Sequence, residues 1–260
     1  MNFDRLKTYN AMASKGALQC MEVISQALPL DKKDTVLDIG CGPGVLTILL
    51  SKRVGRVTAF DVSSEMIAEA KKKNLAENIS YSIGDATKLT TYKEYSHAFD
   101  KVIAYYCLHW MEDSKAALQG IYKSLKPGGL CFLNITQENP DVVDTLSALG
   151  SYISPKWKPF MKGYKHAYYP FKGNAEDYKE ILLSVGFKDI HCRLDVTKLP
   201  MTYEEAKVYY PNFMDQLGRF PEDKKEEYVE EAVKYVIDNG FKDDEGYNMT
   251  TSIIVAVARK

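Results

Sequence analysis

The sequence predicts an α/β fold, in which a mostly parallel sheet of seven strands carries helices on both faces. Short apolar, β-rich runs alternate with helical patterns along most of the chain, beginning with residues 35–39. Asp38, Asp61 and Asp85 end the first three runs at intervals of 23 and 24 residues, about the length of one β-α unit. Because parallel strands bring their carboxyl ends to one edge, we expect these three acids to line a common ligand-binding edge.

The segment 35–44, Thr-Val-Leu-Asp-Ile-Gly-Cys-Gly-Pro-Gly, joins the first strand to the next helix. Its glycines let the backbone turn sharply and approach a ligand closely, and Pro43 suits a helix start. The third glycine comes one residue too early for a dinucleotide fingerprint, and no Lys-Ser/Thr pair follows as in a phosphate P-loop. The remaining pattern, D-x-G-x-G-x-G, resembles motif I of the S-adenosylmethionine-dependent methyltransferases. A dinucleotide site and a purely structural turn are the alternatives.

The other elements of the core follow in chain order. Apolar spacing predicts a helical arm over residues 4–28, which Ser14 divides into two helices. We expect strands at 56–60, 78–83, 99–106 and 130–136, with a Lys-Pro-Gly-Gly turn at 126–129. Helices are expected at 45–54, from Ser63 or Ser64 to 73, and from Asp113 or Ser114 to 125.

After residue 137 the regular alternation ends. Residues 138–173 are rich in proline and aromatic residues, which is typical of a functional insertion. A helix at 175–185, a strand at 190–199, helices within 202–240 and a last strand at 249–258 complete the prediction. We therefore expect a single domain, residues 1–260, with helical cap insertions over the carboxyl edge of the sheet. Its parts are an N-terminal helical arm (1–30), a cofactor-binding core (31–137), a cap insert (138–173), and a C-terminal core with a helical cap (174–260).

The composition describes an ordinary globular protein. Hydrophobic residues make up 45% of its 260 residues and charged residues 27%, which is enough to bury a core. A net charge of −1 gives no sign of a nucleic-acid partner. The five cysteines are scattered and never in C-x-x-C spacing, and His97, His166 and His191 have no convergent partners, so we expect no metal. Reduced thiols, together with the lack of a signal peptide or membrane-spanning run, favour a cytoplasmic protein without membrane contact, whether monomer or homodimer.

The order of strands, helices and turns resembles class I S-adenosylmethionine-dependent methyltransferases, whose fold is Rossmann-like. Residues 106–110, Tyr-Cys-Leu-His-Trp, and the arm around Asn10 look like the juvenile hormone acid O-methyltransferases of arthropods. The same region resembles the trans-aconitate methyltransferase group, and both groups methylate carboxylates. The resemblance implies S-adenosyl-L-methionine as cofactor and a small, lipophilic acid as substrate, similar to juvenile hormone acid or farnesoic acid. A glutamine that the hormone enzymes use near the carboxylate falls on Ala13 here, so a related enzyme with a shifted substrate is an equal alternative.

The expected cofactor site combines the glycine loop with the acids at the strand ends. Asp61 can accept hydrogen bonds from both ribose hydroxyls, and Asp85 from the adenine amino group, with the backbone of Ala86 beside it. Asp38 and the Gly40 carbonyl can meet the cofactor's ammonium group, directly or through water. The full set that we expect to bind the cofactor is Asp38, Gly40, Cys41, Gly42, Gly44, Asp61, Val62, Met66, Asp85, Ala86 and Tyr105.

A carboxylate acceptor needs no general base, because its pKa of about 4 leaves it ionised at neutral pH. His109 and Trp110, the expected catalytic residues, can donate N–H groups that orient it. The expected substrate-binding residues are Tyr9, Ala13, Tyr106, His109, Trp110, Trp157 and Tyr164. The first alternative is an O- or N-methyltransferase acting on a neutral nucleophile with His109 as general base. A cofactor-binding protein without turnover and a dehydrogenase are further alternatives.

Overall fold

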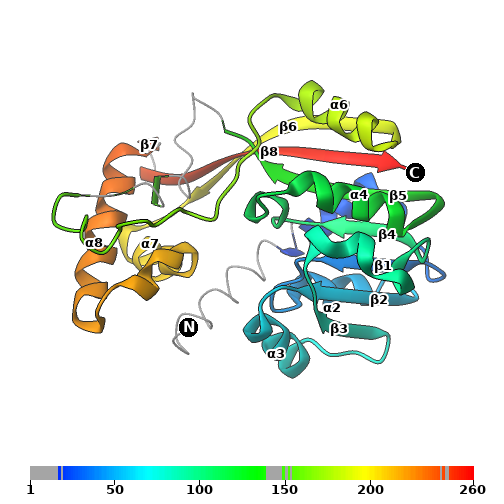
Figure 1. Cartoon of the computed structure of the whole chain (residues 1–260), viewed down its shortest axis with the longest axis horizontal. Coiled ribbons are helices and arrows are strands. Elements are labelled where there is room, and N and C mark those ends of the chain that lie inside the picture. Colours follow the sequence, from blue (N-terminus) through cyan, green and yellow to red (C-terminus); the bar gives the residue numbers. More distant parts are fainter. Residues whose placement is uncertain are drawn as a thin grey trace.

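The computed structural model describes residues 17–18, 20–138, 148–149, 152, 154–240, 242–243 and 246–260. Within them, the predicted α/β fold with a seven-stranded, mostly parallel sheet is confirmed (Figure 1). The strand order is β3-β2-β1-β4-β5-β8-β6. The strands are β1 (Thr35–Ile39), β2 (Arg56–Asp61), β3 (Ile79–Ile83), β4 (Phe99–Ala104), β5 (Leu125–Thr136), β6 (Lys188–Pro200) and β8 (Gly246–Arg259); β7 (Lys242–Asp243) forms a short pair with β8.

Strand direction determines where a ligand can bind. β3, β2, β1, β4 and β5 run parallel, whereas β8 is antiparallel to both of its neighbours, β5 and β6. The carboxyl ends of the five parallel strands therefore share one edge of the sheet, on the side of the second lobe in Figure 1. In open α/β sheets, this edge is where ligands bind.

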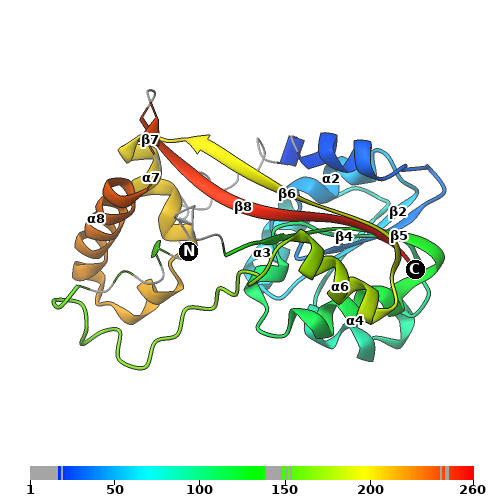
Figure 2. The ribbon, with the colours of Figure 1, turned by 90° about the horizontal axis from the view of Figure 1, so that it is seen from above.

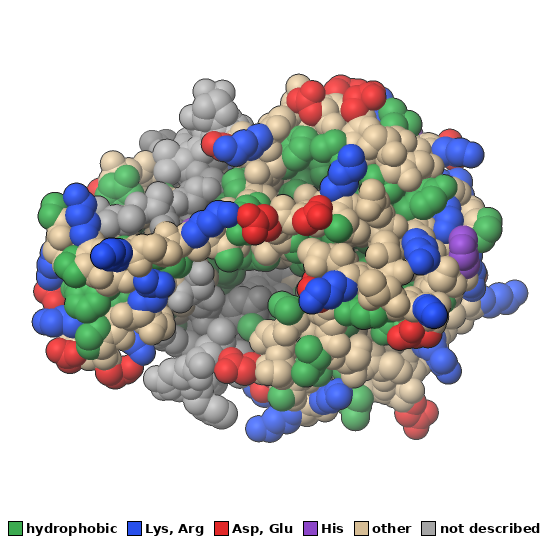
Figure 3. Space-filling model, in the orientation of Figure 1, with side chains coloured by type: hydrophobic (Ala, Val, Ile, Leu, Met, Phe, Trp, Pro, Cys, Tyr) green, Lys and Arg blue, Asp and Glu red, His purple; other side chains and the backbone are tan. Residues whose placement is uncertain are grey.

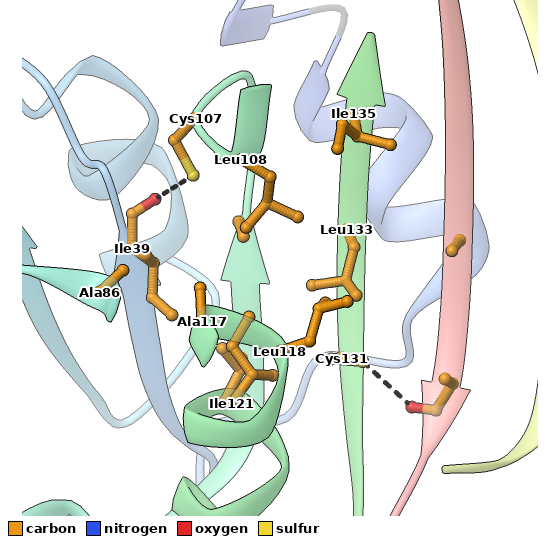
Figure 4. Close-up of a cluster of buried hydrophobic side chains, with 14 of the residues drawn as sticks. Ile39, Ala86, Cys107, Leu108, Ala117, Leu118, Ile121, Cys131, Leu133 and Ile135 are labelled. Carbon is orange, nitrogen blue, oxygen red and sulfur yellow. Dashed lines mark hydrogen bonds between the residues drawn. The ribbon is translucent and has the colours of Figure 1, made fainter. Parts of the chain in front are cut away.

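Helices cover both faces of the sheet (Figure 2). The α-helices of the core are α2 (Val45–Ser51), α3 (Ser64–Lys73), α4 (Ser114–Ser124) and α6 (Ala175–Val185), and residues 20–27 form a further helix. Residues of α4 and α6 pack on one face against alternate residues of β5, namely Cys131, Leu133 and Ile135 (Figure 4). The helix at 20–27 and residues of α2 and α3 pack on the opposite face, which Phe132 also faces.

The second lobe, which we call the cap, is carried by β6 and β8. Residues 253–259 of β8 pair with β5, whereas residues 248–252 pair with β6 alone, so the two strands leave the core as a long ribbon (Figure 2). The cap contains α7 (Tyr203–Tyr209), η4 (Tyr210–Phe213), η5 (Asp215–Arg219) and α8 (Glu222–Asn239). These elements enclose a separate apolar cluster with residues of the 148–164 segment, so the cap has its own core.

Several boundaries differ from the prediction. The first core helix ends at Ser51 rather than Val54, and β4 ends at Ala104 rather than Tyr106. The expected turn at 126–129 lies inside β5, because Leu125 already pairs with Phe99 and a register irregularity with Gly128 at φ 78° absorbs the turn residues. The segment between β3 and β4 forms two short 3-10 helices, η1 (Ala86–Thr91) and η2 (Lys93–Tyr95).

None of the helices in the described residues is long and apolar enough to cross a membrane. The same residues contain no group of three or more histidine, cysteine, aspartate or glutamate side chains that could hold a metal ion.

Candidate active site

The glycine loop after β1 has three left-handed residues with different surroundings. A Cβ atom on Gly40 would overlap Cys107, and one on Gly44 would overlap the hydroxyl of Tyr81. Gly42 also has positive φ, at 54°, but no atom lies within 4 Å of the place where its Cβ would be. Gly42 therefore presents bare backbone to open space, as close approach of a ligand requires. The side chain of Cys41 is buried, so only its backbone is available to a ligand.

Asp61, at the end of β2, holds this loop in place. One carboxylate oxygen accepts a hydrogen bond from the Gly42 N–H at 2.9 Å, and the other accepts from the Ser63 N–H at 2.9 Å. A carboxylate oxygen can accept more than one hydrogen bond, so both remain able to accept from a diol. We propose that Asp61 binds the ribose hydroxyls of the cofactor.

Asp38 lies beneath the loop and is buried. It accepts a hydrogen bond of 2.6 Å from the hydroxyl of Thr47, on α2. Burial raises the pKa of Asp38 to about 7, although the hydrogen bond from Thr47 opposes the shift; the charge of Asp61 adds to it. The Asp38 side chain is covered in this structure. Its contact with the ammonium group, directly or through water, stays a prediction.

Asp85, at the end of β3, acts in this structure as a helix cap. Its carboxylate accepts hydrogen bonds from the Thr87 hydroxyl at 2.6 Å and the Thr87 N–H at 3.0 Å. The hydrogen bond from the Thr87 hydroxyl holds the pKa of Asp85 below its ordinary value. The other carboxylate oxygen lies 3.4 Å from Lys88. The neighbouring Ala86 side chain is buried in the core, so its backbone is the part that can meet a ligand.

Two exposed aliphatic side chains flank the cofactor edge. Val62 is 74% exposed directly after β2, and Ile83 is 62% exposed at the end of β3, where it pairs in register with Asp61. Large apolar side chains left open beside the carboxylates suit the two faces of an adenine ring. The sequence analysis missed Ile83, although an apolar residue that ends a strand just before Gly-Asp was an available signal. Met66 is half-buried on α3, where its N–H donates to Ser63.

The donor and acceptor set fits S-adenosyl-L-methionine. The edge supplies a bare loop backbone at Gly42, acceptors for a diol at Asp61 and apolar surface at Val62 and Ile83. A pyrophosphate would meet the carboxylates of Asp38 and Asp61, so the charge disfavours a dinucleotide. Figure 3 shows this face of the molecule hollowed between the core and the cap.

The loop after β4 brings the aromatic residues to the same edge. Tyr106 has φ 51°, a conformation that is uncommon for a residue with a side chain, and its N–H donates to the side chain of Asn134 on β5. The Tyr105 ring lies 4.6 Å from that of Tyr106. The Cys107 thiol donates to the Ile39 carbonyl at 3.2 Å (Figure 4). These bonds fix the loop between the ends of β1 and β5.

His109, in the short helix η3 (Leu108–Trp110), is buried and neutral. Its Nδ1 accepts a long, 3.5 Å hydrogen bond from the Thr136 N–H, and its carbonyl accepts from the Tyr169 N–H at 2.7 Å. Burial lowers the pKa of His109 to about 3. An imidazole with so low a pKa is a weak proton acceptor at neutral pH, so the geometry disfavours the alternative in which His109 acts as general base.

Trp110 stands where core and cap meet. Its ring lies 5.2 Å from Tyr168 and 6.2 Å from His166, and it stacks at 6.5 Å with Phe213 of the cap. His166 was set aside in the sequence analysis, yet the segment 164–171, which we call the strap, brings it to Trp110. No local sequence pattern predicts this contact, because it depends on how the strap returns from the cap to the edge of the sheet.

The remaining substrate residues fall in three places. Tyr164 is in the strap, where its hydroxyl bonds Nδ1 of His166 at 2.8 Å and the side chain of Gln216 at 3.1 Å. Trp157 is 1% exposed and packs inside the cap, where its N–H donates to Glu231 at 2.6 Å. Its contact with the substrate stays a prediction that this burial does not favour. Tyr9 and Ala13 lie outside the described residues.

Comparisons with known proteins agree with this geometry. A methyltransferase-domain family profile matches residues 36–129, which contain the glycine loop and the edge acids. Residues 36–129 therefore form a methyltransferase domain, and S-adenosyl-L-methionine is the cofactor of this chain.

Two relatives whose names include a substrate match most of this chain. It is 28% identical to the juvenile hormone acid O-methyltransferase of Drosophila melanogaster, over 88% of this chain and 82% of that protein. It is 27% identical to the enzyme of the same name from Bombyx mori, over 90% of this chain and 86% of that protein. The phosphoethanolamine N-methyltransferase 2 of Haemonchus contortus, solved with S-adenosyl-L-methionine, shares the fold with a TM-score of 0.55 at 23% identity, over 93% of this chain and 52% of that one.

Proposed function

We propose that this methyltransferase forms methyl esters, with the carboxylate of a small, lipophilic organic acid as the methyl acceptor. The observation that carries the proposal is the burial of His109, whose ring centroid lies 5.5 Å from that of Trp110 in the loop after β4; burial lowers its pKa to about 3. A buried histidine that is a weak base suits a nucleophile that is already ionised. The names of the Drosophila and Bombyx relatives, which specify an acid as substrate, support the same acceptor class.

The work of the chain in this proposal is positioning and exclusion of water. S-adenosyl-L-methionine, when bound, supplies a methyl group on a positively charged sulfur. Trp110 donates its indole N–H to the acid and holds the carboxylate in line. Tyr105 and Tyr106 offer aromatic faces that stabilise positive charge at the cofactor end of the site.

The aromatic residues around Trp110 form the apolar part of the proposed acceptor pocket. Tyr168 and His166 come from the strap and Phe213 from the cap, so core and cap build the pocket together. Apolar and aromatic side chains around one or two polar groups suit a lipophilic acid. We further propose that the cap excludes water from the acceptor while the methyl group is transferred.

An acceptor panel tests the proposal. The protein is incubated with radiolabelled S-adenosyl-L-methionine and one acid, which is farnesoic acid, lauric acid or trans-aconitate. Control reactions replace the acid with the corresponding primary alcohol or amine, where one exists. We expect base-labile methyl esters from the lipophilic acids and no product from the alcohols or amines. Methylation of amines, alcohols or phenols without any ester would overturn the carboxylate assignment and leave the methyltransferase assignment intact.

A further inference from the structure

Among the described residues, the buried hydroxyl groups of Thr136, at the end of β5, and Tyr178, on α6, make no hydrogen bond, and each residue is 1% exposed. A buried hydroxyl without a partner lowers the stability of the fold, so such a group calls for an explanation. The two groups differ in where they lie, and the difference points to a function for one of them.

The Tyr178 hydroxyl lies among core side chains. Tyr178 packs on the face of the sheet that α4 and α6 cover, with its ring 5.1 Å from that of Phe171. Helices α4 and α6 cover that face, and the cluster around Tyr178 is buried. We assign the Tyr178 hydroxyl no ligand.

Thr136 lies on the other face, at the carboxyl edge. Side chains alternate along β5, so Thr136 shares a face with Asn134, which accepts the hydrogen bond from the Tyr106 N–H. Thr136 is the next side chain on that face towards the edge, and its own N–H reaches His109. The loop that carries Tyr106, His109 and Trp110 therefore passes directly beside Thr136.

The backbone of Thr136 is fixed on the side of β4. Its N–H donates to Nδ1 of His109 at 3.5 Å, and its carbonyl accepts from the Phe171 N–H of the strap at 2.7 Å. With both backbone groups engaged, the hydroxyl is the one group of this residue left to serve a ligand. It is held in place before any ligand arrives, which lowers the entropic cost of using it.

We propose that the Thr136 hydroxyl donates a hydrogen bond to the acceptor carboxylate, as the second donor beside Trp110. This rests on the proposed function, because it requires a carboxylate in the pocket next to Trp110. A hydroxyl donor to one oxygen and an indole N–H to the other would distinguish a carboxylate from a methyl ester or an alcohol. Because Thr136 is buried, neighbouring side chains move aside as the acid enters.

The test compares Thr136→Val, Thr136→Ser and the matched control Tyr178→Phe with the wild-type protein. Valine keeps the shape of threonine without the hydroxyl, serine keeps the hydroxyl, and Tyr178→Phe removes the other unpaired hydroxyl. Calorimetric binding of farnesoic acid in the presence of S-adenosylhomocysteine gives the acid affinity, and calorimetry with S-adenosylhomocysteine alone gives the cofactor affinity. Thermal unfolding of the free proteins gives the stability.

We expect Thr136→Val and Tyr178→Phe to melt at or above the wild-type temperature, since each removes an unpaired buried group. Only Thr136→Val should lose acid affinity, by at least about tenfold, or about 1.4 kcal/mol, with cofactor affinity unchanged and Thr136→Ser close to wild type. The inference on Thr136 would be overturned if Thr136→Val kept the wild-type acid affinity, or if the valine and serine variants lost equal acid affinity. The proposed function would still stand in either case. If the wild-type protein neither binds nor methylates any acid of the panel, the proposed function fails, and this inference fails with it.

Discussion

The three acids at the ends of β1, β2 and β3 have three different environments. Asp38 is buried against Thr47, Asp61 bonds two backbone N–H groups, and Asp85 caps η1. Spacing alone predicts that they share one edge, and the structure agrees. It could not predict their exposure, because burial depends on how α2 and the glycine loop close over β1.

The raised pKa of Asp38 predicts a pH-dependent cofactor affinity. The group ionises at a pH of about 7 in the free protein, against an ordinary value of 3.8. The cofactor's positive charges favour the ionised form, so binding below pH 7 requires loss of a proton. The dissociation constant of S-adenosyl-L-methionine should therefore rise about tenfold from about pH 8 to about pH 6.

Asp38→Asn should flatten this dependence and weaken binding at about pH 8. The substitution should also raise the melting temperature of the free protein at about pH 8. The pKa of Asp38 is higher in the folded protein than in the unfolded chain. Its contribution to stability is therefore present below the unfolded pKa and is lost as the pH rises to about 7. Asp85→Asn is the control, because the lowered pKa of Asp85 keeps it ionised throughout this range. Calorimetric titration across the pH range checks both variants, and an Asp38→Asn protein with the wild-type pH dependence would refute the linkage.

At the scale of elements, local signals predict the core and the cap helices α7 and α8, and fail for the strap. Ser63 caps α3, Asp113 caps α4 and Gly186, at φ 114°, ends α6, as the sequence indicates. The strap has no such signal. It is held by bonds to residues far away in the sequence, from Tyr169 to His109 and from Phe171 to Thr136. The positions of His166 and Trp157 therefore depend on tertiary packing that no periodic pattern encodes.

The two tryptophans of the chain have different expected roles, one in the cap core and one at the proposed acceptor pocket. Trp157→Ala should lower the free energy of unfolding by about 3–5 kcal/mol, because it opens a cavity in the cap core. Trp110 is only half-buried, so Trp110→Ala should cost less stability and raise the KM for the acid at least about tenfold. Both variants should keep S-adenosyl-L-methionine affinity within about twofold, since the glycine loop lies elsewhere.

Denaturant unfolding, methyl-transfer kinetics and cofactor calorimetry measure the three quantities. Should Trp157→Ala keep its stability and lose acid affinity as Trp110→Ala does, Trp157 would contact the substrate after all, and the position assigned to it inside the cap core would be wrong.

At the scale of the whole molecule, the core holds the cofactor edge and the ribbon of β6 and β8 carries the cap (Figure 2). Repeated β-α units make the cofactor half of the site predictable from sequence, since each strand ends at the same edge. The acceptor half lies between two lobes with separate cores, so it depends on how the cap returns to the sheet. That division explains why the sequence identifies the cofactor more sharply than the acid.

The central claim is that the site positions an acceptor that is already ionised and removes no proton from it. The most direct test is the pH dependence of kcat for methylation of farnesoic acid, or of the best acid of the panel, at saturating S-adenosyl-L-methionine. Saturation removes the contribution of Asp38 to cofactor binding. The account predicts a kcat constant within about twofold from about pH 5.5 to about pH 8.5, where a carboxylate stays ionised. A kcat that rises about tenfold per pH unit within this range would show that a proton must leave before transfer, and would contradict the account.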